Sequence, residues 1–307
     1  MTNASIGSER TLPRHLADPI LTIEDFSVDY LGQSVTHAVK HVDLVLGRGE
    51  ILGLAGESGC GKSTLAYGVT RLLKPPAVIA GGRASFHSRE GWTVDLSTLS
   101  GEELRQFRWD KISMVFQGAM NSLNPVLDVQ TQLEDVLTTH RPELKRAERR
   151  ERCAELLEHV GVDRTRLKSY SHELSGGMRQ RVMIAMAMAL DPQVMIMDEP
   201  TTALDVVVQR EILDEISRLR AMLGFAVIFI THDLPLLLEI SDRIAVMKSG
   251  EIVELNDAYE LYTNPQNEYT KRLLASFPSL TGDRGDFIRT GRADDRLAET
   301  DQEVVTP

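Results

Sequence analysis

A glycine-rich segment at residues 56–64 constrains the fold of this chain more than any other feature. It fits the pattern G-x-x-x-x-G-K-[ST] and follows residues 51–55, an apolar run typical of a buried strand. The segment consists of Gly56, Glu57, Ser58, Gly59, Cys60, Gly61, Lys62, Ser63 and Thr64. Residues 62–73 favour a helix, and between a strand and a helix the backbone N–H groups of such a loop curl around phosphates. We therefore expect Lys62 to reach the β- and γ-phosphates of a nucleotide and Ser63 to reach Mg²⁺.

A second apolar run, residues 194–197, ends in two adjacent carboxylates, Asp198 and Glu199. In α/β folds the carboxyl ends of the strands form the edge where ligands bind. We therefore expect Asp198 to hold Mg²⁺, directly or through water, and Glu199 to act as the general base on an attacking water. An Asp-Glu pair can also be a solvated strand end, but the glycine-rich segment earlier in the chain argues against that alternative.

The order of the predicted elements indicates an α/β fold. Helix-like and strand-like patterns alternate in the second half of the chain, which predicts a mainly parallel sheet with helices on both faces. These segments are residues 176–190, 194–197, 206–223 and 226–230. Two further strand-like runs, residues 244–247 and 252–255, predict a closing hairpin.

Other segments are expected outside this sheet. Alternating apolar positions between residues 20 and 45 predict an antiparallel β-subdomain beside the glycine-rich segment. Residues 129–165 are charged and helix-like and predict an all-helical insert. Residues 1–18 predict a flexible arm, and the acidic, aperiodic residues 279–307 predict a disordered tail.

The sequence LSGGM at residues 174–178 opens the predicted helix 176–190. The hydroxyl of Ser175 and the backbone N–H groups at Gly176 and Gly177 would form a second anion-binding site at the positive end of that helix. Ser175 can also cap its own helix, and both roles are compatible.

With LSGGM and the glycine-rich segment in one chain, the sequence resembles an ATP-binding cassette (ABC) ATPase over most of its length. The resemblance implies a P-loop NTPase fold that binds ATP and Mg²⁺. It also implies one ATPase domain at residues 19–278, with a helical subdomain at about 118–175. In this family, one cassette's LSGGM segment binds the ATP held by a partner cassette, so Ser175, Gly176 and Gly177 are expected to act across a dimer.

The resemblance implies roles for four further residues. Gln117 follows the apolar run 112–116, where it would sense the γ-phosphate, and its amide oxygen can also coordinate Mg²⁺. His232 resembles the switch histidine that contacts the γ-phosphate, although a lone histidine is more often structural. Asp205 matches an aspartate at the dimer seam. Tyr30 resembles the aromatic residue that stacks on adenine, with packing on its own sheet as the alternative.

Several stretches resemble one branch of the family, the dipeptide/oligopeptide/nickel importer ATPases. They are residues 122–125, 173–186, 200–206 and 264–271. The LSGGM form resembles the first of the two ATPase subunits that such importers encode. The resemblance therefore implies a second, non-identical ATPase subunit, two membrane permease subunits and an extracytoplasmic substrate-binding protein, with this chain at the cytoplasmic face of the membrane. Peptides are the expected cargo, with nickel and oligosaccharides as alternatives.

Net charge, cysteine spacing and the length of apolar runs exclude several classes of function. The formal net charge of −11 argues against a nucleic-acid partner. The two cysteines, Cys60 and Cys153, match no metal or disulfide spacing, and no cysteine follows Cys153, so no C-terminal iron–sulfur cluster is expected. No apolar run approaches the ~18 residues of a membrane span. A soluble ABC ATPase acting on ribosomes or DNA is the alternative of another class, but the chain has one signature and lacks sustained heptads.

Overall fold

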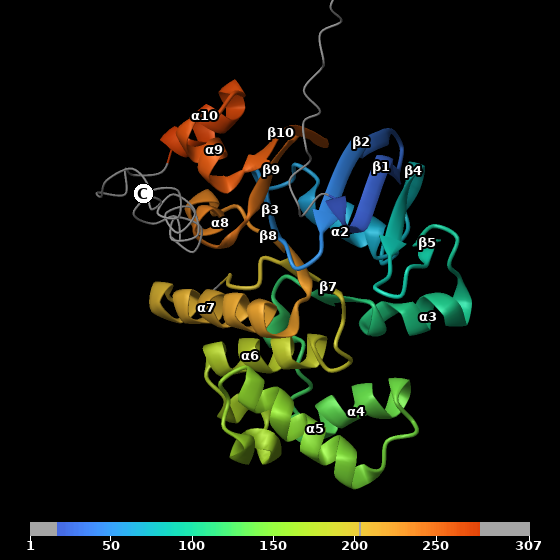
Figure 1. Cartoon of the computed structure of the whole chain (residues 1–307), viewed down its shortest axis with the longest axis vertical. Helices are drawn as coiled ribbons and strands as arrows, with labels where there is room; N and C mark the ends of the chain where they lie inside the picture. Colours follow the sequence, from blue (N-terminus) through green and yellow to red (C-terminus); the bar gives the residue numbers. More distant parts are fainter. Residues whose placement is uncertain (1–16, 203, 277–307) are drawn as a thin grey trace, which may run out of the picture.

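The computed structural model of the chain describes residues 17–202 and 204–276 (Figure 1). The predicted tail at residues 279–307, and all of the predicted arm except residues 17 and 18, lie outside the described residues. Within the described part of the chain, no helix is long and apolar enough to cross a membrane.

The larger of the two sheets carries the glycine-rich segment. Its strand order is β10-β9-β3-β8-β7-β6, and all neighbours pair in parallel except β10, which runs antiparallel to β9. The strands are β3 (Ile51–Ala55), β6 (Ile112–Val115), β7 (Val194–Asp198), β8 (Ala226–Ile230), β9 (Arg243–Lys248) and β10 (Glu251–Asp257). Every residue of β3, β7 and β8 is buried, as expected of strands covered on both faces. The predicted parallel sheet and closing hairpin are confirmed.

The smaller sheet is antiparallel, with the order β2-β1-β4-β5. Its strands are β1 (Pro19–Leu31), β2 (Val35–Gly47), β4 (Ala77–His87) and β5 (Thr93–Asp95). The pairing of β1 with β2 confirms the predicted antiparallel strands, whereas β4 and β5 were not predicted. A bulge explains the weak signal of β4, because Gly82 has φ +77° and a Cβ atom there would lie 2.2 Å from the Asp25 carbonyl oxygen.

Helix α2 (Lys62–Val69) begins at the glycine-rich segment and packs against both sheets. Its Leu65 belongs to one buried cluster with Phe26 of the small sheet and Leu52 of the large sheet. The helix is about one turn shorter than predicted, because Arg71 adopts the left-handed backbone conformation at φ 58° and ends it.

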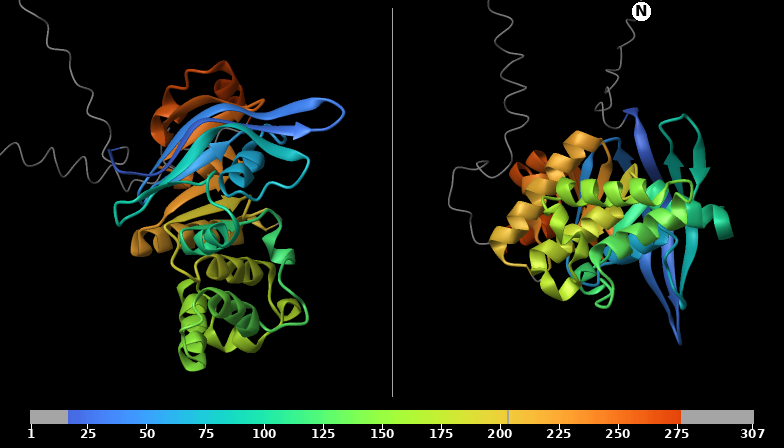
Figure 2. Two further views of the ribbon diagram at one scale, coloured as in Figure 1. Left: turned by 90° about the vertical axis from the view of Figure 1, so that its right-hand side faces the viewer. Right: turned by 90° about the horizontal axis from the view of Figure 1, so that it is seen from below.

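The remaining helices cover the large sheet or extend away from it. They are α3 (Gly101–Asp110), α4 (Val129–His140), α5 (Arg146–His159), α6 (Gly176–Ala187), α7 (Val206–Leu223), α8 (Leu234–Ile240), α9 (Ala258–Thr263) and α10 (Glu268–Ala275), with short 3₁₀ turns at Ala119–Asn121, Arg164–Lys168 and Ser171–Glu173. Helices α4 and α5 form a layer beyond α6, on the side away from the small sheet (Figure 2). Helices α9 and α10 lie beside β9 and β10 at the opposite end of the molecule.

Candidate nucleotide-binding site

A cavity of about 500 Å³ opens over the glycine-rich segment. Its size falls within the range of small-molecule pockets. Nine of the predicted site residues line it, namely Tyr30, Ser58, Gly59, Gly61, Lys62, Ser63, Thr64, Gln117 and Glu199. The structure therefore brings together residues from β1, the glycine-rich segment and the ends of β6 and β7.

Six lining residues were not predicted. They are Thr36, His37, Ala38 and Lys40 of β2, together with Ser249 and Gly250 in the turn between β9 and β10. The antiparallel pairing of β1 with β2 places Thr36 opposite Tyr30, so the antiparallel strands predicted between residues 20 and 45 held a signal for the first group. The turn residues reach the cavity only through tertiary packing, in which the Gly250 N–H donates to the Cys60 carbonyl over 2.9 Å.

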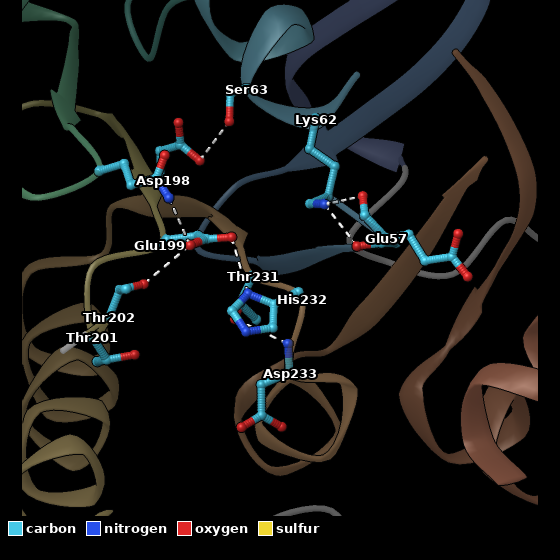
Figure 3. A network of polar contacts seen from close by, with 12 residues as sticks. Glu57, Lys62, Ser63, Asp198, Glu199, Thr201, Thr202, Thr231, His232 and Asp233 are labelled. Carbon is cyan, nitrogen blue, oxygen red and sulfur yellow. Dashed lines mark hydrogen bonds and ion pairs between the residues drawn. The ribbon is translucent and has the colours of Figure 1, made fainter. Parts of the chain in front are cut away.

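The ammonium of Lys62 points toward the main chain at Glu57 (Figure 3). Its Nζ donates to the carbonyl oxygens of Gly56 and Glu57 over 2.7 and 2.9 Å. At Gly61, φ is +112° and a Cβ atom would lie 2.4 Å from the Ala38 carbonyl oxygen, so only glycine allows this close approach of loop and β2. A fixed cation at the start of α2 creates a strongly anion-attracting cavity floor.

Three predicted loop residues, Gly56, Glu57 and Cys60, do not line the cavity. The carbonyl groups of Gly56 and Glu57 instead hold Lys62. The thiol of Cys60 is buried, and its Sγ lies 3.7 Å from Lys62 Nζ. These residues therefore contact Lys62 and stabilise the loop, but they do not face the cavity.

Asp198 is fully buried at the end of β7. Its Oδ1 accepts a hydrogen bond of 3.0 Å from Ser63 Oγ, whereas its Oδ2 accepts none of normal geometry from the described residues. Burial raises the pKa of Asp198 above its usual value, although the Ser63 hydrogen bond opposes the shift. A buried carboxylate with an unused oxygen beside a hydroxyl is a donor set that suits a divalent cation.

Glu199 accepts hydrogen bonds from both of the other predicted catalytic residues, Gln117 and His232. Its Oε2 accepts from Gln117 Nε2 over 2.9 Å and from Thr202 Oγ1 over 3.1 Å, and its Oε1 accepts from His232 Nδ1 over 3.0 Å. Burial raises the pKa of Glu199, but the hydrogen bonds from His232 and Thr202 outweigh this effect and hold it below the usual value. Glu199 also has φ 47°, a conformation that costs a non-glycine residue energy and is concentrated at functional sites.

Tyr30 lines the cavity from β1, and its hydroxyl lies 3.3 Å from the Oγ1 atom of Thr64. Its side chain is therefore part of the cavity wall. Thr202, whose hydroxyl donates to Glu199, was not predicted as a site residue. Its position three residues after Glu199 in the sequence was the signal that could have indicated this contact.

Four predicted residues, Ser175, Gly176, Gly177 and Asp205, lie away from this cavity. Ser175 caps α6 by accepting from the Met178 N–H over 3.2 Å, and Asp205 caps α7 by accepting from the Val208 N–H over 3.0 Å. A Cβ atom at Gly177 would lie 2.6 Å from Val208 Cγ1, so the starts of α6 and α7 are in close contact. The starts of α6 and α7 thus lie together, and their four predicted site residues do not line the cavity.

Replacing Gly177 with alanine is expected to lower the free energy of unfolding by about 1–3 kcal/mol, because the added methyl group overlaps Val208. Urea denaturation of the purified chain measures this loss. The matched control is Gly176→Ala, whose Cβ atom would meet Leu204 at an ordinary 3.5 Å. Equal stability of the two variants would contradict the packing role of Gly177.

A phosphate-binding loop after β3, an Asp-Glu pair at the end of β7 and a capped glycine pair at the start of α6 together define an ATP-binding cassette. Comparison with known sequences agrees, since the sequence model of the ABC transporter family matches residues 39–202. The chain belongs to the ABC transporter family and is an ATPase cassette of that family.

Similar proteins extend the likeness beyond the matched segment. A putative peptide import ATP-binding protein of Brucella melitensis is 44% identical over 83% of this chain and 75% of its own length. The dipeptide transport ATP-binding protein DppD of Bacillus subtilis is 40% identical over 86% of this chain and 78% of its own length. A peptidoglycan transport ATP-binding protein of Agrobacterium fabrum is 44% identical over 85% of this chain, which spans 47% of that relative.

Solved structures share the fold. The dimeric, post-hydrolysis structure of the cassette MJ0796, bound to ADP and Pi, has a TM-score of 0.67 at 28% identity. The match covers 78% of this chain and 98% of that one. The predicted fold class, an ABC cassette with an antiparallel β-subdomain, is confirmed.

Proposed function

We propose that this chain is the ATP-hydrolysing subunit of an importer that takes up peptides through separate membrane subunits. The observation that carries the proposal is the arrangement of Glu199, held by three side chains beside a cavity that contains Lys62. Peptide cargo is supported by the relatives at 40–44% identity whose names refer to peptide or dipeptide transport.

ATP would bind with its phosphates over the glycine-rich segment and its adenine toward Tyr30. The loop N–H groups and the Lys62 ammonium would take the phosphate charge. Tyr30 and residues of β2 form one part of the cavity wall, and the face of the Tyr30 ring suits stacking on a planar base.

Three residues fit a Mg²⁺ site. Asp198 supplies the unused buried oxygen, Ser63 a hydroxyl, and Gln117 an amide oxygen. When bound, Mg²⁺ would neutralise charge on the β- and γ-phosphates. The chain's own part is to hold these oxygens close to Lys62 and to keep Asp198 out of bulk water.

Glu199 would take a proton from the attacking water. Since its pKa is held below the usual value, its carboxylate is ionised at neutral pH and can accept that proton. His232, Gln117 and Thr202 fix the direction of the carboxylate, and His232 and Gln117 can turn toward a bound γ-phosphate. Their release from Glu199 would then free the base for the reaction.

The proposed assembly contains a second, non-identical ATPase subunit, two permease subunits and an extracytoplasmic binding protein, with this chain at the cytoplasmic membrane face. We propose residues 19–278 as its ATPase domain and residues 118–175 as a helical subdomain. The dimeric form of the solved cassette supports a paired arrangement.

Uptake by cells that carry the complete transporter tests the proposal. A Lys62→Ala chain should abolish uptake of a labelled peptide, because the phosphate charge then has no cation in the loop. The exposed Lys74→Ala serves as the control and should transport normally. Uptake of a labelled oligosaccharide and of nickel is measured in parallel. If Lys62→Ala abolished uptake of one of these and left peptide uptake unchanged, that compound and not peptide would be the cargo.

Asp198→Asn is expected to weaken MgATP binding by about 10–100-fold, because an amide removes the anionic oxygen offered to the metal. Binding of ATP in EDTA should change little. The melting temperature of the metal-free, nucleotide-free protein should stay equal or rise, since the substitution removes a buried charge whose pKa is raised by burial. Calorimetric titration and thermal unfolding provide these measurements. A lower melting temperature with unchanged MgATP affinity would assign Asp198 a structural role.

A further inference from the structure

The C-terminal helix α10 contacts the phosphate-binding loop through one buried side chain. Tyr269 is 6% exposed, and its hydroxyl accepts a hydrogen bond of 3.2 Å from the Glu57 N–H. Residue 269 lies outside residues 39–202, the segment that matches the family as a whole. A contact across 212 residues thus connects the end of the described chain to the start of the loop.

Tyr269 is held in place by contacts on both sides of it in sequence. The Glu254 carboxylate of β10 accepts from the backbone N–H groups of Gln266 and Asn267 over 2.7 and 3.0 Å. Asn267 in turn caps α10 by accepting from the Tyr269 N–H over 2.8 Å. The hydroxyl of Tyr269 is therefore positioned by β10 and does not depend on the loop for its location.

The same strand pair braces the loop at a second point. Lys248, the last residue of β9, places its Nζ 5.0 Å from the centre of the Tyr269 ring, a cation–π contact. Two residues later, the Gly250 N–H donates to the Cys60 carbonyl. The loop is thus fixed at Glu57 by α10 and at Cys60 by the β9–β10 turn, on either side of Ser58 and Gly59, two of the loop residues that line the cavity.

We propose that Tyr269 is a positioning residue for nucleotide binding, which preorganises the phosphate-binding loop through the Glu57 N–H. The inference rests on the proposed binding of ATP in this cavity. A loop whose N–H groups already converge loses less conformational freedom when phosphate binds, so its affinity is higher. Burial raises the pKa of Tyr269, so its hydroxyl stays neutral at physiological pH and remains able to make this contact.

The test is Tyr269→Phe in the full-length chain, which removes one oxygen and keeps the ring over Lys248. We expect ATP to bind about three- to tenfold more weakly, the change that loss of one neutral hydrogen bond produces. In the nucleotide-free protein, amide exchange in the peptide that contains Glu57 should accelerate. The assembled transporter should keep its kcat while its KM for ATP rises. Tyr259→Phe, on the exposed Tyr259 of α9, is the matched control and should change none of these values.

A second variant separates the backbone contact from the Glu57 side chain. Glu57→Ala retains the N–H group, so Tyr269→Phe should weaken ATP binding by the same factor in that background. Wild-type affinity or wild-type exchange in Tyr269→Phe would overturn the inference, as would a loss of affinity that accompanies a lowered melting temperature. If the wild-type chain itself failed to bind ATP, the proposed function would fail as well, whereas wild-type binding with an unaffected Tyr269→Phe would remove this inference alone.

Discussion

Glu199→Gln is expected to lower the ATPase rate of the assembled transporter by about 10²–10⁴-fold, the usual contribution of a general base. The amide is nearly isosteric with the carboxylate but cannot take a proton from water. Its oxygen can still accept from one of the groups that now meet at Glu199, so the site should remain folded. ATP affinity should stay near the wild-type value, because Lys62 and the loop are unchanged.

Single-turnover hydrolysis and equilibrium ATP binding, measured on the same preparation, separate the two effects. Glu103→Gln on α3 is the matched control, since it makes the same chemical change on the protein surface. A Glu199→Gln chain that hydrolysed ATP at the wild-type rate in its own site would show that another group activates the water. A chain that lost ATP binding instead would assign Glu199 to the structure of the cavity.

The parts of the site that could be predicted from sequence are those fixed by local chain geometry. Lys62 and Ser63 follow from a contiguous pattern between a strand and a helix, and Asp198 and Glu199 follow from the end of a buried strand. The parallel sheet then forces these strand ends to one edge. Gln117 and His232 needed the resemblance to a family, because an isolated glutamine or histidine after a strand has no distinctive pattern.

Other features could not be read from the sequence, for physical reasons. Tyr269 and Gly250 reach the loop only because β9 and β10 fold back beside β3, and neither periodicity nor spacing encodes that contact. Strand β4 was missed because its glycine bulge interrupts the alternation of apolar residues.

Ser175, Gly176 and Gly177 at the start of α6 do not line the chain's own cavity. Their separation from it motivates the proposal of a composite site, in which two paired cassettes together build each ATP site. Ser175 is exposed and lines no part of the cavity over Lys62. Exposed N–H donors at the positive end of a helix attract anions. If two cassettes pair, each such helix start can meet the phosphates bound to the loop of the other, so that each ATP contacts both subunits.

Ser175→Arg is accordingly expected to impair the site built on the partner's loop and to spare ATP binding at this chain's own Lys62. Hydrolysis at the partner's site should fall by about 10²-fold, comparable to the loss of an oriented hydrogen-bond donor to the reacting group. Lys62→Ala should have the reverse pattern, with loss of binding at this chain's loop. Photo-crosslinking of labelled ATP to each subunit, combined with the ATPase rate of the assembled complex, distinguishes the two sites.

Ser175→Arg also removes the N-terminal cap of α6 and so lowers the stability of the chain. A control variant must account for this loss of stability. Removing Ser175 Oγ from the Met178 N–H should cost about 0.5–2 kcal/mol of stability. Asp128→Ala removes the Asp128 cap of α4, whose Oδ1 accepts from the Thr131 N–H over 2.8 Å, together with an ion pair of 3.2 Å to the exposed Lys168. It should therefore cost at least as much stability as loss of the Ser175 cap, without affecting hydrolysis at the partner's site. In the proposed pairing, an isolated monomer lacks the partner's LSGGM segment, so the ATPase rate of the purified chain should also rise with protein concentration. A fast rate that is independent of concentration, or equal losses in Ser175→Arg and Asp128→Ala, would rule out the composite site and require that one cassette complete its own ATP site.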